Sequence, residues 1–518
     1  MLLRNGEKTA STKEVVKTSP EAIELSLSNN AEQPPVHSVF TRHQKIYISG
    51  SASFAGFISS MSSHVYFPAL NTVASDLRVS GGLINLTVTC YLIFQGLSPM
   101  FLGDFADKAG RRPAYIVCFL LYLVSNIGLA LQTDYAALFV LRCVQSIGIS
   151  PAMALSAGVV SDITTAAERG SYMGSVTAGA LLGPAVGPVI GGLLAEYLGW
   201  RAIFWFLVIV AGVFVVQFLV FLPETARKIV GNGSAPCSWW NQSLLGWYQR
   251  KRASQKGYAS RATVKRPRVG FPNPARTFSV IFQKDTGIIL LSNAILLISY
   301  YDACACIPSI YKELYGLNAL QIGLCYLPLG VGAAIACIGT GKVLDYNYKR
   351  IAAHLNIPLH ETHTNPGNLA GFPIEKARLQ AVFPLLTIGS LAVIVFGWVL
   401  EFGMHLAVPT TMLFFIGGCM TAANSIVCTL LVDLYPANAS AAAASRHFVR
   451  CLFGAAATAL LEPMLNGMGR GWCFTLVALI TFVNAPLLLA VIRYGPRWRE
   501  QRASRSCGGI SGNRPPEA

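Results

Sequence analysis

Long runs of apolar residues, separated by polar segments, recur along the 518 residues of this chain. A run of about 20 apolar residues is long enough to cross the hydrocarbon core of a bilayer as a helix. The pattern predicts an all-α membrane protein with six such helices before a long polar stretch and six after it. The expected spans are 46–67, 82–102, 113–132, 137–161, 171–195, 202–222, 286–311, 320–341, 379–400, 408–432, 446–465 and 472–493.

The polar segments divide the chain into five parts. The N-terminus is polar and has no apolar core, which is not typical of a signal peptide, so we expect the first span to direct insertion. The expected parts are a disordered cytosolic tail at 1–45, a six-helix half at 46–225, a basic cytosolic loop at 226–285, a second six-helix half at 286–493 and a cytosolic tail at 494–518.

The composition changes this picture little. Hydrophobic residues make up 53% of the chain and charged residues 12%, which is too little charge to cover the surface of a soluble protein of this length. Nearly all of the thirteen cysteines fall inside the apolar runs. We interpret them as small apolar packing residues and expect no metal site and no disulfide framework.

The distribution of basic residues predicts the orientation. With the N-terminus in the cytosol, 35 of the 40 Lys and Arg residues lie on the cytosolic side, four lie on the other side, and Arg142 remains inside a span. Basic residues are enriched in cytosolic loops of membrane proteins. We therefore expect both termini in the cytosol and the plasma membrane as the location.

The segment 226–284 has twelve basic residues and no acidic one. RNA binding is one interpretation, but such charge also fixes topology and attracts anionic lipid of the inner leaflet. Trp239, Trp240 and Trp247 could let part of this loop lie on the membrane surface. We favour the lipid interpretation and expect no nucleic-acid partner.

A motif of glycine, aspartate and arginine follows the second span of each half. Glycine suits a tight turn between helices, and the aspartate can pair with an arginine of a neighbouring helix as a breakable latch. Equivalent loops in two halves indicate a parallel internal repeat. The motif residues are Gly103, Asp107, Gly110, Arg111 and Arg112 in the first half, and Gly341, Asp345 and Arg350 in the second.

These loops resemble the signature of the major facilitator superfamily between spans 2 and 3. Arg142, Gln145 and Gly148 are similar to that family's fourth-span motif, although Ser146 stands where glycine is usual. The resemblance covers about residues 45–495 and is closest to the fungal twelve-span drug:proton antiporter branch. It implies the major facilitator fold, with twelve helices in two six-helix pseudo-repeats, and export by proton antiport.

Span 5 contains a motif similar to the one that this family's antiporters carry. Its glycines are spaced four residues apart on one helix face, where small residues let a second helix approach closely. Its two prolines bend the helix. The alternatives are a passive packing seam and a hinge that also blocks leakage. The motif residues are Gly179, Gly183, Pro184, Gly187, Pro188, Gly191 and Gly192.

Arg142 in span 4, with Gln145 one turn later, is the clearest charged residue inside a span. A buried arginine is costly and rarely faces lipid. It could bind an anionic substrate, pair with a coupling carboxylate or brace neighbouring helices.

Spans 7 and 1 each carry a polar stripe that we expect to face a central cavity. Asp302 lies near the middle of span 7, where burial disfavours its charged form, so it could carry a proton or be a structural hydrogen-bonding group. His64 could titrate or lie in the interface. Besides Asp302, the stripe residues of span 7 are Ser292, Ser299, Cys306 and Ser309, with Asn293, Tyr300 and Tyr301 beside them, and those of span 1 include Ser60 and His64.

No GxSxG, P-loop or HExxH motif occurs, so we expect neither an enzyme nor an ATP-driven pump. The leading hypothesis is an exporter of drugs, toxins or secondary metabolites that uses a proton gradient and no cofactor. The alternative is an exporter of di- or tricarboxylic acids such as citrate or itaconate, with Arg142 as the anion clamp. A transport-inactive sensor is a remote alternative, because the expected tails are short. We expect a monomer whose partners are a small molecule and the bilayer.

Overall fold

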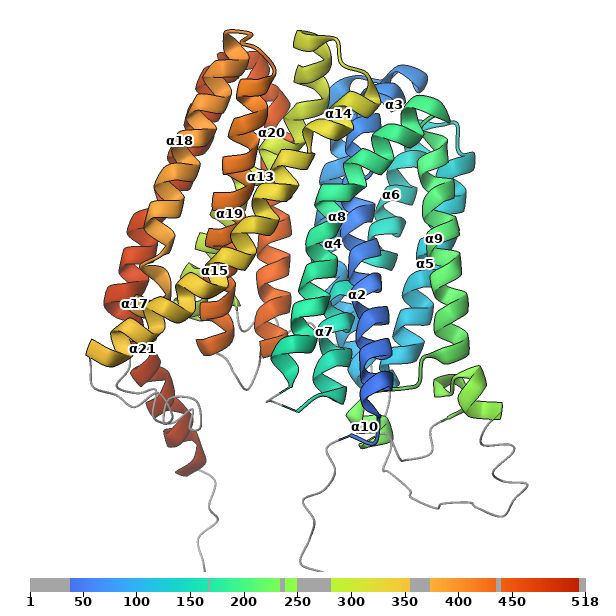
Figure 1. Cartoon of the computed structure of the whole chain (residues 1–518), viewed down its shortest axis with the longest axis vertical. Helices are drawn as coiled ribbons and strands as arrows, with labels where there is room; N and C mark the ends of the chain where they lie inside the picture. The colour runs from blue at the N-terminus through green and yellow to red at the C-terminus, as the bar shows by residue number, and fades with distance from the viewer. Residues whose placement is uncertain are drawn as a thin grey trace, which may run out of the picture.

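A computed structural model gives the fold and describes residues 38–165, 168–232, 238–248, 281–354, 373–434 and 439–511. Within these ranges the chain is helical and contains no strand, which confirms the predicted all-α membrane protein. The expected N-terminal tail up to residue 37 and most of the expected central loop, residues 249–280, lie outside the described ranges. Figure 1 shows two bundles of long, roughly parallel helices side by side.

The first bundle runs from α2 to α9. Its helices begin where the sequence supplies caps: Thr41 and Gln44 form a reciprocal capping box at α2, and Ser80 and Asp134 cap α4 and α6. The bounds are α2 Arg42–His64, η1 Phe67–Ala69, α3 Leu70–Asp76, α4 Gly81–Ala109, α5 Arg111–Leu131, α6 Tyr135–Ile149, α7 Pro151–Ile163, α8 Arg169–Tyr197 and α9 Arg201–Phe221, followed by α10 Arg227–Val230 and η2 Trp239–Asn241.

The second bundle runs from α13 to α21. Inside α20 the backbone of Gly469 leaves helical geometry, with φ 80° and ψ 169°, so this element contains two helices and a reversal between them. The bounds are α13 Lys284–Tyr315, α14 Ala319–Cys325, α15 Leu327–His354, α17 Ile374–Leu379, α18 Val382–Glu401, α19 Ala407–Leu434, α20 Ala439–Phe482 and α21 Asn484–Ser511.

Ten stretches of the described chain are long and apolar enough to cross a membrane. One of them, Ala443–Gln501, is 59 residues long and includes the reversal at Gly469. Helix α2 is not among the ten, although it has 23 residues. This count is compatible with the twelve predicted spans.

Span 4, expected over 137–161, is one apolar stretch, Tyr135–Ile163, within which Pro151 starts α7 directly after α6. One local expectation about the backbone is wrong. The turn of the first glycine motif does not lie at Gly103, because α4 continues to Ala109 with an ion pair of 2.7 Å between Asp104 and Lys108. The chain turns at Gly110 instead, where φ is 116° and glycine is favoured.

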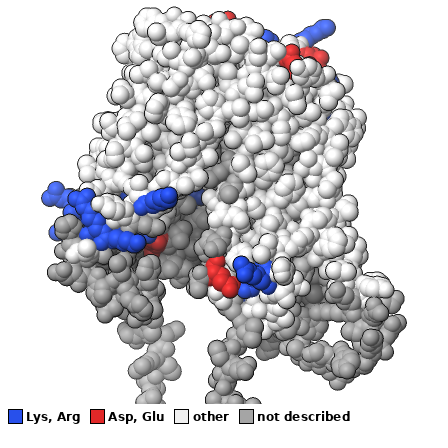
Figure 2. All heavy atoms as spheres, in the orientation of Figure 1, with Lys and Arg blue, Asp and Glu red and all other residues white. Residues whose placement is uncertain are grey.

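The bundles contact each other mainly at one end of the molecule. Helix α4 packs on α20, and α8 packs on α14 and α15. We call the end that carries α10 and α17 the basic end and the end that carries α3 and α14 the opposite end (Figure 1). The surface is hollowed between the bundles toward the basic end, where Lys and Arg side chains gather (Figure 2).

Candidate functional site

Arg142 of α6 is buried in the first bundle, with 1% of its surface exposed. Its guanidinium lies between two aromatic faces, with Cζ 4.3 Å from the ring centre of Tyr66 and 4.4 Å from that of Tyr91. The Nη1 group donates a hydrogen bond of 2.6 Å to Oε1 of Gln145. Aromatic faces attract a cation but leave its N–H groups free to donate at the edge.

A chain of hydrogen bonds fixes Gln145. Its Nε2 donates to Oδ1 of Asn126 at 2.7 Å, and Asn126 Nδ2 donates to the carbonyl of Tyr122 at 2.6 Å. Tyr122 in turn donates to Ser62 of α2 at 3.0 Å. The amide of Gln145 is therefore held with its oxygen toward Arg142, and no carboxylate takes part.

A second group of cations lies on α20 and was missed at the sequence level. Arg446 and Arg450 were counted with the cytosolic basic residues at the start of span 11, but α20 begins at Ala439 and places both arginines within the helix, each partly buried. The Arg450 Nη2 lies 2.7 Å from Nδ1 of His447. Arg450 also interacts electrostatically with Tyr301 of α13 and with His64 of α2. Two features of the sequence could have indicated them. The alanine-rich segment before Arg446 favours an earlier start of the helix, and Arg446 and Arg450 are one helical turn apart, so they share a face.

Neither Arg142 nor these two arginines forms an ion pair with any described residue. The Nε groups of all three are buried without a hydrogen-bond acceptor in the described part of the chain. Buried cations without an acidic partner are costly, so this arrangement favours binding of an anion between the bundles.

The polar stripe of span 7 does not lie entirely along a central space, as was expected. Ser299 contacts Thr481 at 2.7 Å, and the carbonyl of Ser292 accepts from Asn484 at 2.9 Å, so this part of the stripe packs against the end of α20 and the start of α21. Asn293 donates to Asn424 of α19 at 2.8 Å. Helical period predicts which residues share a face, but it does not predict which helix that face meets.

Asp302 is buried on α13, with 2% of its surface exposed. Its Oδ1 has no hydrogen-bond partner among the described residues, and the sulfurs of Cys306 and Cys473 are near it. On the same helix, Tyr300 and Tyr301 are buried on the side of Arg450, whereas Ser309 is exposed toward the opposite end. Asp302 and the cations therefore do not form one cluster.

The polar side of α2 packs against the glycine face of α8. Ser53 donates to the carbonyl of Ser175 at 2.6 Å, and a Cβ built on Gly183 would lie 2.6 Å from Cβ of Ser60. Nδ1 of His64 lies 2.7 Å from Oγ of Ser63 and 2.9 Å from the carbonyl of Ser60.

The remaining members of the fifth-span motif divide between two partners. Gly179, Gly187 and Gly191 also face α2, whereas Pro188 and Gly192 contact α14 of the second bundle. Pro184 lies between the two faces and is partly buried. Helix α8 thus packs closely against α2 of its own bundle and against α14 of the second bundle.

The loop motif of the first bundle makes a network at the basic end. Arg111 pairs with Asp107 at 2.7 Å and with Asp162 at the end of α7 at 3.0 Å. The second bundle has a similar ion pair. Arg378 of α17 pairs with Asp433 near the end of α19 at 3.0 Å, in the position that corresponds to Arg111–Asp162.

The second glycine motif does not reproduce the first. Gly341 lies inside α15, and Arg350 is exposed on the same helix, so this motif forms no turn. The side chain of Asp345 lies outside what the structure describes.

Arg112 and Glu224 cap each other's helices. The guanidinium of Arg112 donates to the carbonyls of Leu222 at 2.5 Å and Leu219 at 2.8 Å, at the end of α9. The carboxylate of Glu224 accepts from the backbone N–H groups of Arg111 at 2.9 Å and Arg112 at 3.2 Å, at the start of α5. Burial raises the pKa of Glu224, and the N–H donors partly offset this effect.

Two carboxylates connect the bundles at the opposite end. Glu462 of α20 accepts from Asn85 Nδ2 at 3.1 Å and lies against Gly81 and Gly82, the first residues of α4. Glu196 of α8 accepts from the backbone N–H of Ala319, the first residue of α14, at 3.0 Å. Each bundle therefore places a carboxylate at a helix N-terminus of the other, where negative charge is favoured.

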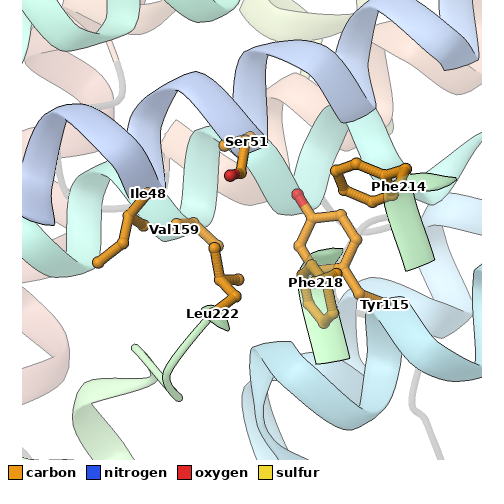
Figure 3. Close-up of a pocket in the computed structure, with 8 residues that line it drawn as sticks. Ile48, Ser51, Tyr115, Val159, Phe214, Phe218 and Leu222 are labelled. Atoms are coloured by element: carbon orange, nitrogen blue, oxygen red, sulfur yellow. The ribbon is translucent and has the colours of Figure 1, made fainter. Parts of the chain in front are cut away.

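A small apolar pocket between α2, α5, α7 and α9 lies apart from these polar groups (Figure 3). Tyr115, Phe214 and Phe218 point into it, together with Ile48 and Leu222. It is a packing crevice of the first bundle and offers an anion no partner.

Comparison with known proteins gives one consistent result. The family profile described as "Major Facilitator Superfamily" matches residues 52–458. The chain is 42% identical to "MFS-type transporter phiD" of a fungal species over 95% of this chain and 74% of that protein. It is 36% identical to "Citrate exporter 1" of Aspergillus niger over 96% of this chain and 94% of the exporter.

Solved structures share the fold. A peptide transporter, POT, in complex with sulfate has a TM-score of 0.61 and 14% identity, over 88% of this chain and 95% of that one. The xylose transporter XylE from E. coli, in a partially occluded inward-open conformation, has a TM-score of 0.57 and 13% identity, over 87% and 98%. At these identities the likeness concerns the fold alone.

Proposed function

This chain belongs to the major facilitator superfamily and is a multi-pass secondary transporter, and from that premise we propose that it exports small organic anions by alternating access. The observation that carries the proposal is a set of three arginines without acidic partners among the described residues. Arg142 is buried, and Arg446 and Arg450 are partly buried with their Nε groups shielded from solvent. A carboxylate of the substrate supplies the missing acceptors.

Arg142 is the central residue of this proposal. Charge-assisted hydrogen bonds from a guanidinium to a carboxylate are short and strong, and they strengthen where water is excluded. The rings of Tyr66 and Tyr91 keep the cation in place without neutralising it. Gln145 holds one N–H group, and the others remain for the ligand.

The structural evidence favours the carboxylate alternative over the drug or toxin hypothesis. The latter rests on resemblance to a branch of the family, whereas the former rests on three specific cations. A citrate exporter among the similar proteins is in keeping with an acidic substrate. An acidic secondary metabolite with an aromatic part would use both the arginines and the tyrosine rings.

The direction of transport is part of the proposal. If the basic end faces the cytosol, the hollow between the bundles opens to the cytosol and the opposite end is closed (Figure 2). Such a conformation takes substrate from inside the cell. We further propose the plasma membrane as the location and a proton gradient as the energy source.

Export of labelled citrate and itaconate from preloaded vesicles tests the anion clamp. Losing a buried charge-assisted hydrogen bond costs roughly 1.5–3 kcal/mol, so Arg142→Gln is expected to weaken substrate affinity about 10- to 150-fold. Arg142→Lys keeps the charge but loses the planar fork and is expected to be partly active.

The matched control is Arg201→Gln, since Arg201 pairs with Asp76 at the opposite end and lies outside the proposed site. It should leave substrate affinity unchanged. Normal carboxylate export by both Arg142 variants, at normal abundance in the membrane, would show that the clamp is wrong.

A further inference from the structure

The cations of α20 carry an inference that rests on the proposed function and narrows the substrate class. Arg446 and Arg450 are one helical turn apart, so they share one face of α20, and His447 lies beside them. Like charges at this spacing repel each other in the absence of a counter-charge. Neither arginine pairs with an acidic side chain in the described part of the chain.

The acidic side chains of the second bundle that the structure describes do not pair with these arginines. Asp433 is paired with Arg378, and Asp302 is near cysteine sulfurs rather than near an arginine. The buried Nε groups of Arg446 and Arg450 have no acceptor among the described residues. An anion bound at this face would provide the acceptors and reduce the repulsion.

Both groups of cations border the same face of α4. The ring of Tyr91 lies under Arg142. One turn further along α4, Gln95 has its Oε1 4.0 Å from Sγ of Cys451, the neighbour of Arg450, and its backbone meets the ring of His447. Four residues of an α-helix rise about 6 Å, so the two groups meet α4 at positions one helical turn apart.

Tyr301 of α13 lies against the cations of α20. Tyr301 interacts electrostatically with Arg446 and Arg450, and its ring packs against Gly454, one turn further along α20. A Cβ on Gly454 would lie 2.8 Å from the Tyr301 ring, so this close approach requires glycine.

We propose that Arg446, His447 and Arg450 form a second anion-binding site facing Arg142, and that the transporter therefore selects di- or tricarboxylates over monocarboxylates. One carboxylate binds Arg142 in the first bundle. A second carboxylate of the same molecule binds the cations of α20 in the second bundle. The substrate thereby bridges the two bundles whose relative movement exports it.

The test compares two ligands of equal size that differ by one charge. Succinate and its half-amide, succinamate, compete for uptake of a labelled dicarboxylate into proteoliposomes containing the purified full-length protein. One charge-assisted contact corresponds to about 10- to 150-fold in affinity, so the unaltered protein is expected to prefer succinate by a factor in this range.

Arg450→Gln is expected to reduce this preference to near one while succinamate still competes. Arg446→Gln should reduce it partly, and Arg450→Lys should retain part of it. Lys312→Gln removes an exposed positive charge of α13 at the opposite end and should leave the preference unchanged. If Arg450→Gln does not fold, the test rests on Arg446→Gln, which must lower the preference for succinate while succinamate still competes.

Two results would overturn the inference. The first is an unaltered protein that binds succinate and succinamate equally. That result would refute the second anion site but not the proposed export of carboxylates through Arg142. The second is an Arg450 variant that either keeps the full preference or loses affinity for both ligands by the same factor. An unaltered protein that binds neither ligand would instead refute the proposed function itself.

Discussion

The carboxylate of Asp302 lies in surroundings that disfavour a charge. It is buried among sulfur and carbon atoms, and one carboxylate oxygen has no partner in the described part of the chain. Charge at such a position is costly, and we propose that Asp302 binds and releases a proton when a movement brings water to it. The structure places it near Cys473 in the second part of α20 rather than beside the arginines.

Asp302→Asn imitates the protonated carboxyl group permanently. We expect this variant to lose uphill export driven by a pH gradient and to retain exchange of substrate across the membrane, because exchange needs no proton release. Measuring both modes in the same proteoliposomes checks the prediction. A variant that is inactive in both modes would indicate a structural role, and one still driven by the pH gradient would move coupling elsewhere.

At the level of elements, α5 and α9 stabilise each other through their ends. The start of a helix leaves N–H groups without acceptors, and its end leaves carbonyl groups without donors. Glu224 satisfies the first set for α5, and Arg112 satisfies the second set for α9. Glu224 also accepts from the N–H groups of Thr225 and Ala226 at 2.9 Å each, which fixes the chain after α9.

Glu224→Ala removes the acceptor of several buried N–H groups at once. An unsatisfied buried group costs about 1–3 kcal/mol, so we expect a clear decrease in the thermal midpoint of the purified protein. Glu168→Ala is the control, since Glu168 makes an exposed ion pair with Lys45 that contributes about 0–1 kcal/mol. Equal midpoints for the two variants would contradict the capping role.

The sequence pattern predicted most elements and one of the two groups of cations. Arg142 stands out because it interrupts an apolar run, whereas Arg446 and Arg450 follow small residues and were taken for a polar border. The turn at Gly110 was placed too early, because the pattern does not show that Asp104 and Lys108 continue α4. Contacts between distant helices, such as Ser299 with Thr481, have no signal in one sequence.

For the whole molecule, the conformation is determined where the bundles meet. At the opposite end Glu462 and Glu196 bridge them, and Phe67 stacks on Tyr326 across the same boundary with ring centres 6.1 Å apart. Further contacts between the bundles join α4 to α20 and α8 to α14 and α15. Alternating access requires these contacts to break when the opposite end opens.

Glu462→Gln is expected to make that opening easier. A carboxylate at a helix N-terminus contributes up to about 1 kcal/mol, which corresponds to about a fivefold change in the equilibrium between the two conformations. A cysteine in place of Thr458, which lies beneath Glu462 and contacts Thr89 at 3.2 Å, reports opening through its reaction with an impermeant thiol reagent.

Labelling of this cysteine from the opposite side should increase about fivefold in the Glu462 variant. Glu313→Gln is the control, because Glu313 pairs with Arg470 within the second bundle and does not connect the bundles. Unchanged labelling in the Glu462 variant would show that this contact does not control the closed conformation.

The reciprocal caps also have a consequence during biosynthesis. Arg112 and Glu224 are 112 residues apart, so α5 leaves the ribosome long before the carboxylate that satisfies its first turn. Until α9 has entered the bilayer, the nascent first bundle therefore contains an uncapped helix end and an unbound arginine. We expect a chain that stops before Glu224 to expose both groups to quality-control proteases, whereas a chain that includes Glu224 can complete these caps before synthesis of the second bundle begins.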